Sequence, residues 1–255
     1  MSRNFELLQK LGKEQELLGS FPIEPASGPA ASATASVPGY AAPAFAPMPG
    51  LEEITGIVQQ VFLMPGASAP RSVVFAGTEP GTGVTWVTAR VAEALAGRVA
   101  ASVCLVDANL RTPGLHQQMG VENQVGLGDA LLHSDPIRNF ARPLSPDNLW
   151  ILTAGSSMEN QQGLLASDRM RLRMQELRSE FDFVLIDTPS LTVSNASIGL
   201  GSLSDGVVLV LKANASRRES ATQAVEDFQL GNAKVLGAVL NQRTYPIPNK
   251  IYNKL

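Results

Sequence analysis

Residues Arg71–Arg90 read RSVVFAGTEPGTGVTWVTAR. The apolar, β-branched run Ser72–Phe75 predicts a buried strand, and the amphipathic pattern from Thr85 onward predicts a helix. Between them, Gly77–Thr85 holds too much glycine and proline to be helical. A strand, a glycine-rich turn and a helix are the layout of a phosphate-cradling loop. The glycines let backbone N–H groups approach an anion, and the helix N-terminus adds partial positive charge.

This loop lacks the lysine that such loops carry. The usual signature ends in Gly-Lys-Ser/Thr, whereas this one ends in Gly83-Val84-Thr85. The predicted phosphate-binding residues are Gly81, Thr82, Gly83, Val84 and Thr85. The Thr85 hydroxyl would bind Mg²⁺ or cap the helix, and the two roles can coexist. Because a full positive charge is missing, we expect ATP or ADP with Mg²⁺ to bind weakly or not at all.

Composition bounds the class of protein. The 255 residues, 44% hydrophobic and 17% charged, allow one large α/β domain with appendages, and the net charge of −3 gives no case for nucleic acid. The single cysteine, Cys104, excludes an internal disulfide, and His116 and His133 alone cannot make a zinc site. The charged residues 1–18 are no secretory signal, and no segment reaches the roughly 18–20 apolar residues that span a bilayer. We therefore expect a cytoplasmic protein without a membrane span.

The chain divides into four predicted segments. Residues 1–18 form a helix, which either faces solvent or docks on a partner. Residues 19–50, rich in Pro, Ala, Ser and Gly, are a disordered linker because they can bury too little. The globular domain covers residues 51–243 and begins with a helix over Leu51–Leu63. The tail, residues 244–255, carries two tyrosines and is predicted to be mobile.

From Ser72 onward, apolar strands alternate with amphipathic helices. This order predicts an α/β fold with a mostly parallel sheet sandwiched by helices and a ligand at the carboxyl ends of the strands. Continuous apolar runs indicate that both faces of the strands are covered. The predicted strands are 72–75, 101–106, 149–152, 183–186, 207–211 and 234–240. The predicted helices are 85–96, 126–133, 166–179, 196–203 and 218–230.

Two aspartates follow buried strands directly. Asp107 ends the run from Ser102, and Asp187 ends the run from Phe183. An acid at such a position lies at the ligand edge of the sheet, although capping of a turn is the plain alternative for Asp107. The second acidic element of nucleoside triphosphatases holds Mg²⁺ or its water shell. Thr85, Asp107 and Asp187 are therefore the predicted metal site, with the two aspartates as catalytic residues.

These elements, in this order, resemble the bacterial tyrosine kinases (BY-kinases) of capsule and exopolysaccharide export, which are relatives of the MinD/ParA-like P-loop ATPases. The resemblance covers about residues 51–243 and is carried by VDANLRTP, FVLIDTPS and VLGAVLNQR. It implies a P-loop NTPase fold, ATP and Mg²⁺ as cofactors, and Asn241 near adenine. It also implies ring assembly, a membrane partner that controls polysaccharide chain length, and phosphorylation of tail tyrosines, here Tyr245 and Tyr252.

The chain departs from that family at its working positions. In addition to Val84, Asn109 stands where the family has the second acid of an Asp-x-Asp pattern, and Asn195 stands where an Asp precedes Ala. The first helix has Gly56 and Gln59 where the family's ring-forming helix carries arginines. Changes at several mutually dependent positions favour a relaxed or redirected function.

Other side chains near the loop leave alternatives open. Arg111 and Lys212 lie near the predicted ligand edge and could replace the lysine, whereas Arg71 should lie at the far end of its strand. Trp86, in the first helical turn, either packs against the linker or the first helix or partly fills the nucleotide pocket. We favour packing.

The favoured function is a catalytically degenerate, BY-kinase-like subunit of capsule or exopolysaccharide biosynthesis that regulates or binds, with weak or no ATP hydrolysis. Its expected partner, which would recruit it to the inner face of the membrane, is a chain-length regulator or export protein, or an active kinase paralogue. The first alternative is an active ATP-dependent protein-tyrosine autokinase with Asp107 as base, supported by the retained Thr85 and Asp187. A second alternative is a ParA/MinD-like switch ATPase.

Overall fold

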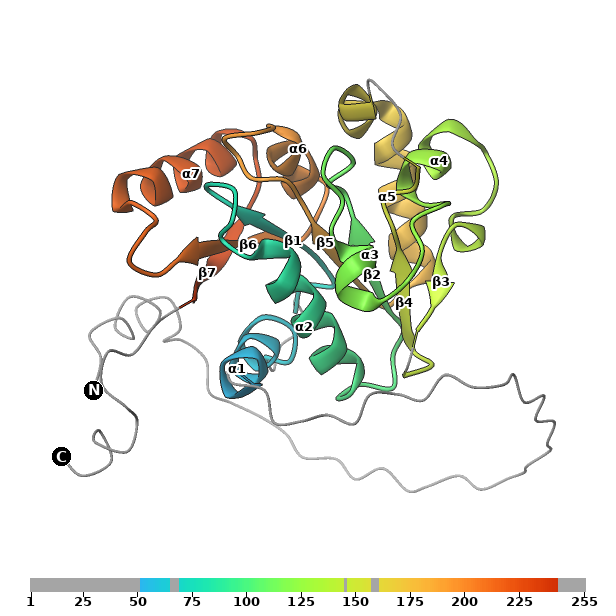
Figure 1. Ribbon diagram of the computed structural model, residues 1–255, viewed down its shortest axis with the longest axis horizontal. Coiled ribbons are helices and arrows are strands. Elements are labelled where there is room, and N and C mark those ends of the chain that lie inside the picture. The colour runs from blue at the N-terminus through green and yellow to red at the C-terminus, as the bar shows by residue number, and fades with distance from the viewer. Residues whose placement is uncertain (1–50, 65–68, 145, 157–160, 243–255) are drawn as a thin grey trace, which may run out of the picture. The chain divides into compact units, whose positions relative to one another are not determined.

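The structure is a computed structural model that describes residues 51–64, 69–144, 146–156 and 161–242. Within these residues, seven strands form one sheet in the order β3-β4-β2-β5-β1-β6-β7 (Figure 1). All neighbours are parallel except β3 and β4. The strands are β1 (Ser72–Gly77), β2 (Val103–Asp107), β3 (Arg142–Pro143), β4 (Leu149–Leu152), β5 (Phe183–Asp187), β6 (Gly206–Lys212) and β7 (Val235–Asn241).

Helices cover both faces of this sheet. Along β1, Val74 and Ala76 pack into one hydrophobic core, and Val73 and Phe75 pack into a second. The first core includes side chains of α4 to α7, and the second includes side chains of α1 to α3. The helices are α1 (Leu51–Val61), α2 (Val84–Ala96), α3 (Leu115–Met119), α4 (Leu127–Leu132), α5 (Asp168–Glu180), α6 (Ala196–Ser202) and α7 (Arg218–Leu230), with 3₁₀ turns η2 (Ile137–Asn139) and η3 (Gln161–Ala166).

The predicted α/β architecture is confirmed, and each predicted strand and helix of the globular domain begins and ends within two residues of its expected bounds. Sequence patterns missed β3, α3 and the 3₁₀ turns because these elements are too short to show periodicity. The predicted helix 1–18, the linker 19–50 and the tail with Tyr245 and Tyr252 lie outside the described residues. Among the described helices, none is long and apolar enough to cross a membrane.

The expectation of strands covered on both faces is wrong for β7. Its residues are half-buried or exposed, and Leu240 is 55% exposed. In the described part of the chain, β7 pairs with β6 and ends the sheet. A strand at an edge has a neighbour on one side, so fewer elements pack around it.

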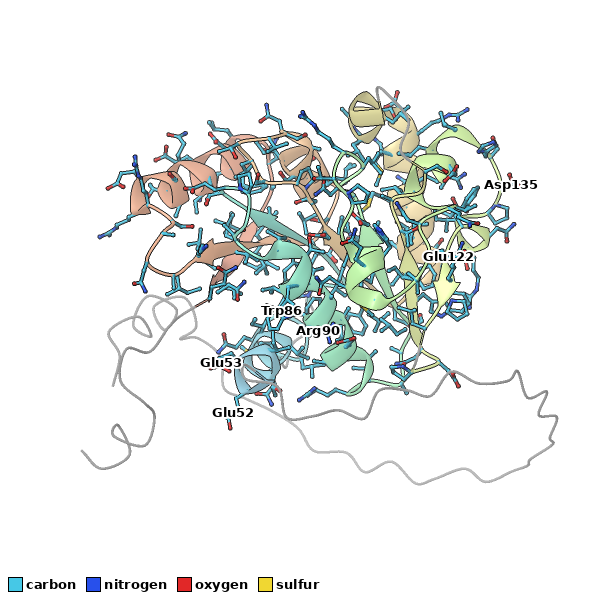
Figure 2. All side chains as sticks on the ribbon, in the orientation of Figure 1. Glu52, Glu53, Trp86, Arg90, Glu122 and Asp135 are labelled. Atoms are coloured by element: carbon cyan, nitrogen blue, oxygen red, sulfur yellow. The ribbon has the colours of Figure 1, made fainter. Side chains whose placement is uncertain are left out.

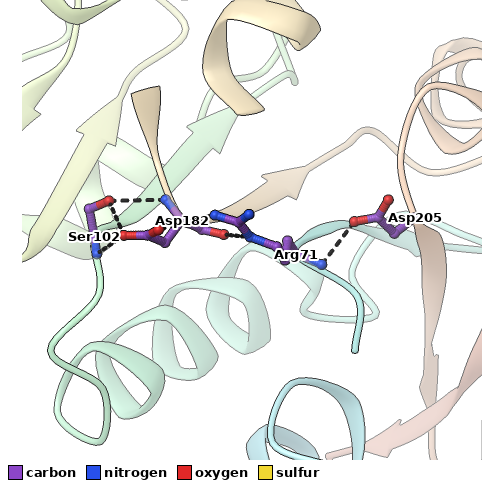
Figure 3. A network of polar contacts seen from close by, with 4 residues as sticks. All are labelled: Arg71, Ser102, Asp182 and Asp205. Atoms are coloured by element: carbon purple, nitrogen blue, oxygen red, sulfur yellow. Dashed lines mark hydrogen bonds and ion pairs between the residues drawn. The ribbon is translucent and has the colours of Figure 1, made fainter. Parts of the chain in front are cut away.

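A polar network ties the strands together at their amino ends (Figure 3). One carboxylate oxygen of Asp205 accepts the backbone N–H groups of Arg71 and Ser72, both at 2.8 Å. Asp182 accepts the backbone N–H and the hydroxyl of Ser102, both at 2.9 Å, and pairs with the Arg71 guanidinium at 3.0 Å. The network joins the beginnings of β1, β2, β5 and β6. Arg71 therefore lies at the end of β1 away from the glycine-rich loop, as predicted.

These contacts lower the pKa of both carboxylates. The backbone N–H and then the hydroxyl of Ser102 lower the pKa of Asp182. For Asp205, burial raises the pKa, but the N–H groups at the start of β1 and the Arg178 side chain outweigh burial, so the net pKa is lowered. A carboxyl with a lowered folded-state pKa stabilises the fold above its unfolded pKa, and this stabilisation is lost as the pH falls through the folded value.

We therefore expect the urea midpoint of unfolding to fall as the pH drops below about 4, the ordinary pKa of Asp. Asp205→Asn should unfold at lower urea at neutral pH and show a flatter pH dependence. The matched control is Asp135→Asn, which removes an exposed carboxylate and should keep the wild-type curve. An Asp205→Asn curve that parallels the wild type at every pH would contradict this assignment.

Candidate functional site

The loop from Gly77 to Thr85 joins β1 to α2 in a conformation that needs glycine. Gly81 and Gly83 have φ angles of 81° and 84°, the left-handed region that other residues rarely adopt. A Cβ on Gly77 would overlap the Thr82 hydroxyl, since the loop folds back over this residue. Gly83 directly precedes α2 at its N-cap position and provides no side-chain cap. The first backbone N–H groups of α2 therefore remain open to an anion.

The end of β7 holds this loop in place. The side-chain amide of Asn241 donates to the carbonyl of Thr82 at 2.8 Å, and that of Gln242 donates to the carbonyl of Gly81 at 3.2 Å. A Cβ on Gly83 would overlap the Asn241 amide nitrogen, so the close approach itself requires glycine. The predicted contact of Asn241 with adenine stays a prediction. Sequence reasoning missed Gln242, which carried no signal beyond following Asn241.

The loop borders a pocket of about 240 Å³, somewhat below the roughly 300–1,000 Å³ of typical small-molecule sites. Among the described residues, its wall is made of hydroxyls, amides and hydrocarbon, and Glu79 is the one charged side chain that lines it. The lining residues are Glu79, Pro80, Gly81, Thr82, Gly83, Val84, Thr85, Asn109, Thr112, Thr188, Pro189, Ser190 and Val193. The pocket is therefore lined by no lysine or arginine of the described residues.

The two proposed replacements for the missing lysine do not take its place. Neither Arg111 nor Lys212 lines the pocket, and both are exposed. Val84 is buried in the same core as α1 and α2, with its side chain over Gly77. Trp86 also packs against that core, on α2 near α1 (Figure 2), and does not line the pocket. The packing interpretation of Trp86 is confirmed.

The predicted aspartates lie side by side beneath the loop. β2 and β5 are parallel neighbours, and Asp107 and Asp187 are opposite one another in their register. Asp107 is fully buried and accepts the backbone N–H groups of Asn109 at 3.0 Å and of Gly114 and Leu115 at 3.1 Å. Burial raises its pKa to about 6, although these hydrogen bonds oppose the shift.

Asp187 is buried as deeply but is not satisfied. It is 1% exposed, and neither carboxylate oxygen has a well-oriented hydrogen-bond partner among the described residues. Burial raises its pKa and the charge of Asp107 raises it further, while the nearby Thr85 hydroxyl lowers it. A buried carboxylate without a partner is costly unless a cation compensates it. A metal ion beside Asp187 would meet this requirement.

The residues present fit a magnesium ion. Mg²⁺ keeps several waters and is commonly held by one or two carboxylates together with phosphate oxygens. Asp187 and the Thr85 hydroxyl would bind it, and Asp107 lies opposite Asp187 on the neighbouring strand β2. The described residues contain no cluster of three or more His, Cys, Asp or Glu, so the site depends on oxygen from a hydroxyl, water or ligand.

The altered positions Asn109 and Asn195 have different surroundings. Asn109 lines the pocket, but its side-chain oxygen accepts the backbone N–H and the hydroxyl of Thr112, both at 3.2 Å. It therefore shapes the loop after β2 instead of presenting an acid. Asn195 directly precedes α6 at its N-cap position, but its side chain makes no capping hydrogen bond and does not line the pocket.

Further hydroxyls lie at the site: Thr82 was among the predicted phosphate-binding residues, whereas Thr78, Thr188 and Ser190 were missed by sequence reasoning. Thr78 and Thr82 are buried within the loop, and their hydroxyls lack a hydrogen-bond partner among the described atoms. Thr188 and Ser190 line the pocket from the segment after β5. Threonine inside a glycine-rich loop was the available signal, but periodicity arguments give it no weight.

Comparison with protein families, curated proteins and solved structures gives relatives that share this fold. The family model for "Cellulose biosynthesis protein BcsQ" matches residues 71–229. Tyrosine-protein kinase YwqD of Bacillus subtilis (strain 168) is 34% identical over 172 residues, which are 67% of this chain and 72% of that protein. The crystal structure of the chimerical protein CapA2B2 has a TM-score of 0.70 at 26% identity, over 76% of this chain and 85% of that one.

A more distant structure shows the shared fold. The septum site-determining protein MinD of Pyrococcus horikoshii OT3, complexed with Mg-ADP, has a TM-score of 0.58 at 21% identity, over 72% of this chain and 76% of that one. The sheet order and the glycine-rich loop define an α/β P-loop fold, which this chain shares with MinD. By its match to the family model, the chain belongs to the family of cellulose biosynthesis protein BcsQ. By its identity to YwqD, it belongs to the bacterial tyrosine kinases.

Proposed function

We propose that this chain is a catalytically degenerate regulatory or binding subunit of capsule or exopolysaccharide biosynthesis. The observation that carries the proposal is the pocket, which no described lysine or arginine lines. Phosphoryl transfer depends on positioning and on cations that stabilise charge on the transferred group. With Val84 at the lysine position, positive charge there would have to come from a metal ion or a partner.

The names of the relatives support the biological setting. The matching family model describes a cellulose biosynthesis protein, and YwqD is named a tyrosine-protein kinase. The proposed partner is a membrane protein that controls polysaccharide chain length or serves export, or an active kinase paralogue. Binding to such a partner would bring this chain to the inner face of the membrane.

The active-kinase alternative also has an observation in its favour. Thr85, Asp107 and Asp187 remain together, and backbone hydrogen bonds hold the Asp107 carboxylate in a fixed position. A group placed in this way could serve as a base toward a tyrosine hydroxyl. In that case Tyr245 and Tyr252 would be the acceptors and the chain would be a non-specific protein-tyrosine kinase.

Incubation with Mg²⁺ and labelled ATP distinguishes the two functions. We expect no phosphotyrosine from the purified full chain, because Mg²⁺ without a lysine or arginine compensates too little of the transition-state charge at the phosphate. Val84→Lys should raise ATP affinity about tenfold or more, the effect of one added charge-assisted contact. Thermal melting of each variant shows whether it is folded. Strong labelling that disappears in Asp107→Asn would establish the active kinase instead.

A further inference from the structure

Two side-chain amides at the end of β7 hold the glycine-rich loop by its carbonyl groups. In the sheet, β6 lies between β1 and β7, so these side chains reach the loop across the carboxyl end of β6. Asn241 donates to the carbonyl of Thr82 at 2.8 Å, and Gln242 donates to the carbonyl of Gly81 at 3.2 Å. The two contacts fasten two successive peptide units in a segment that is neither helix nor strand.

The orientation of these carbonyls determines where the loop directs its N–H groups. In a planar trans peptide, the C=O of one residue and the N–H of the next point in opposite directions. Because the Gly81 and Thr82 carbonyls face the end of β7, the N–H groups of Thr82 and Gly83 are turned away from it. Both of these residues line the pocket. The end of β7 therefore determines which way two backbone donors of the pocket wall face.

These two N–H groups have no hydrogen-bond acceptor among the described residues. Thr82 is only 2% exposed, and a backbone N–H in so buried a residue is expected to have a partner. An oxygen atom of a ligand in the pocket would satisfy it. Phosphate oxygens suit this position, because they accept strong hydrogen bonds from backbone N–H groups at the start of a helix.

Gln242 makes its contact from an uncommon backbone conformation. Its φ angle is 56°, in the left-handed region that disfavours residues with a side chain. The other two non-glycine residues with positive φ in the described chain are Asn214 and Asn232, and asparagine tolerates this region. Glutamine has no such preference, so surrounding contacts have to hold it there. Backbone strain of this kind is kept where it positions a group for function.

We propose that Asn241 and Gln242 are positioning residues for anion binding. They fix the glycine-rich loop so that the N–H groups of Thr82 and Gly83 face the pocket, where these groups bind a phosphate or diphosphate group without a lysine. This inference rests on the proposed function in one respect, since it uses the same pocket. It adds a dependence of that pocket on the end of β7, two strands away in the sheet from β1.

The first experiment titrates the full chain with inorganic pyrophosphate in a calorimeter. Gln242→Ala and Asn241→Ala should each weaken binding about fivefold, the contribution of one hydrogen bond. Pyrophosphate carries no base, so an effect of Asn241→Ala cannot arise from contact with adenine. The matched control is Gln229→Ala, which removes an exposed amide from α7 and should bind as the wild type does. No binding by the wild type, or equal affinities of all variants, would overturn the proposal.

Gln242→Gly separates positioning from a merely structural role. Glycine adopts the left-handed conformation without strain but has no side-chain amide to donate. We therefore expect a urea midpoint close to that of the wild type, together with the weakened pyrophosphate binding of Gln242→Ala. Full affinity in this variant would show that the amide does not position the loop. A midpoint and an affinity that fall together would assign Gln242 to stability alone, and either result would overturn the proposal.

The dependence also has to act in the opposite direction, because linkage between two sites is reciprocal. Saturating pyrophosphate should slow hydrogen exchange of the backbone amides of residues 239–241, at the end of β7, and leave those at its start unchanged. Unchanged exchange at both ends would overturn the proposal. Failure of the proposed function is distinguishable: phosphotyrosine formation would remove the degenerate assignment, whereas pyrophosphate binding and its dependence on Gln242 decide this inference.

Discussion

Gly126→Ala should lower the free energy of unfolding by about 3 kcal/mol or more, the upper range for forced overpacking. A Cβ at this position would overlap the Thr153 carbonyl oxygen and the Gly155 backbone nitrogen and lie 2.6 Å from the Thr153 carbonyl carbon. These are backbone atoms, so no rotamer change can relieve the overlap. They are also fixed, since Leu127 donates its N–H to the Thr153 carbonyl at 2.7 Å. Urea unfolding at constant pH measures the effect.

The control for this prediction is the same substitution where space is available. Gly199 lies inside α6, and nothing lies within 4 Å of an added Cβ. Gly199→Ala should therefore raise the free energy of unfolding by about 0.5–1 kcal/mol, because alanine loses less backbone entropy in a helix. If both variants shift the urea midpoint in the same direction, the packing described around Gly126 is incorrect.

Asp187→Asn should raise the free energy of unfolding by roughly 1–3 kcal/mol when no metal is present, because the neutral amide has no charge to desolvate and none to repel Asp107. The substitution removes a carboxylate that is 1% exposed, has no well-oriented partner among the described residues and lies opposite Asp107. Excess Mg²⁺ should stabilise the wild type and leave the variant unchanged. Urea unfolding in EDTA and in Mg²⁺ provides the comparison.

A substitution at the other end of β5 is expected to change the stability in the opposite direction. Asp182 directly precedes β5, and its carboxylate accepts the backbone N–H and the hydroxyl of Ser102. Asp182→Asn should therefore destabilise the fold in EDTA, where Asp187→Asn stabilises it. Two substitutions of the same type, at the two ends of β5, are expected to differ in sign. Among the described residues, Asp182 has hydrogen-bond partners, whereas Asp187 has none that is well oriented. A loss of stability in both variants would mean that Asp187 is compensated within the protein.

Much of the candidate site was predictable because its residues are defined by local order along the chain. The loop that ends in Gly83-Val84-Thr85 follows a strand, and Asp107 and Asp187 each end another. Parallel strands place their carboxyl ends at one edge of a sheet, so the sequence predicts that these residues gather there. The absence of lysine is likewise visible in the sequence. Strand and helix positions followed from runs of apolar residues.

The remaining features of the site depend on contacts between residues that are far apart in the sequence. The hydrogen bond from the Asn241 side chain to the Thr82 carbonyl joins residues 159 positions apart. No pattern along the sequence predicts this contact. The exclusion of Arg111 and Lys212 from the pocket was equally unpredictable, because long side chains near an edge can point in many directions. The half-exposed β7 reflects its place at the edge of the sheet, which strand composition does not encode.

The sequence by itself determined the alternation of strands and helices, the glycine-rich loop and the loss of its positive charge, because these are properties of neighbouring residues. Only the tertiary structure decided that Asp107 is satisfied while Asp187 is not, and that no described lysine or arginine lines the pocket. The physical reason is that hydrogen bonding and burial depend on which distant atoms meet. Strand register and loop packing determine which of these distant atoms come into contact.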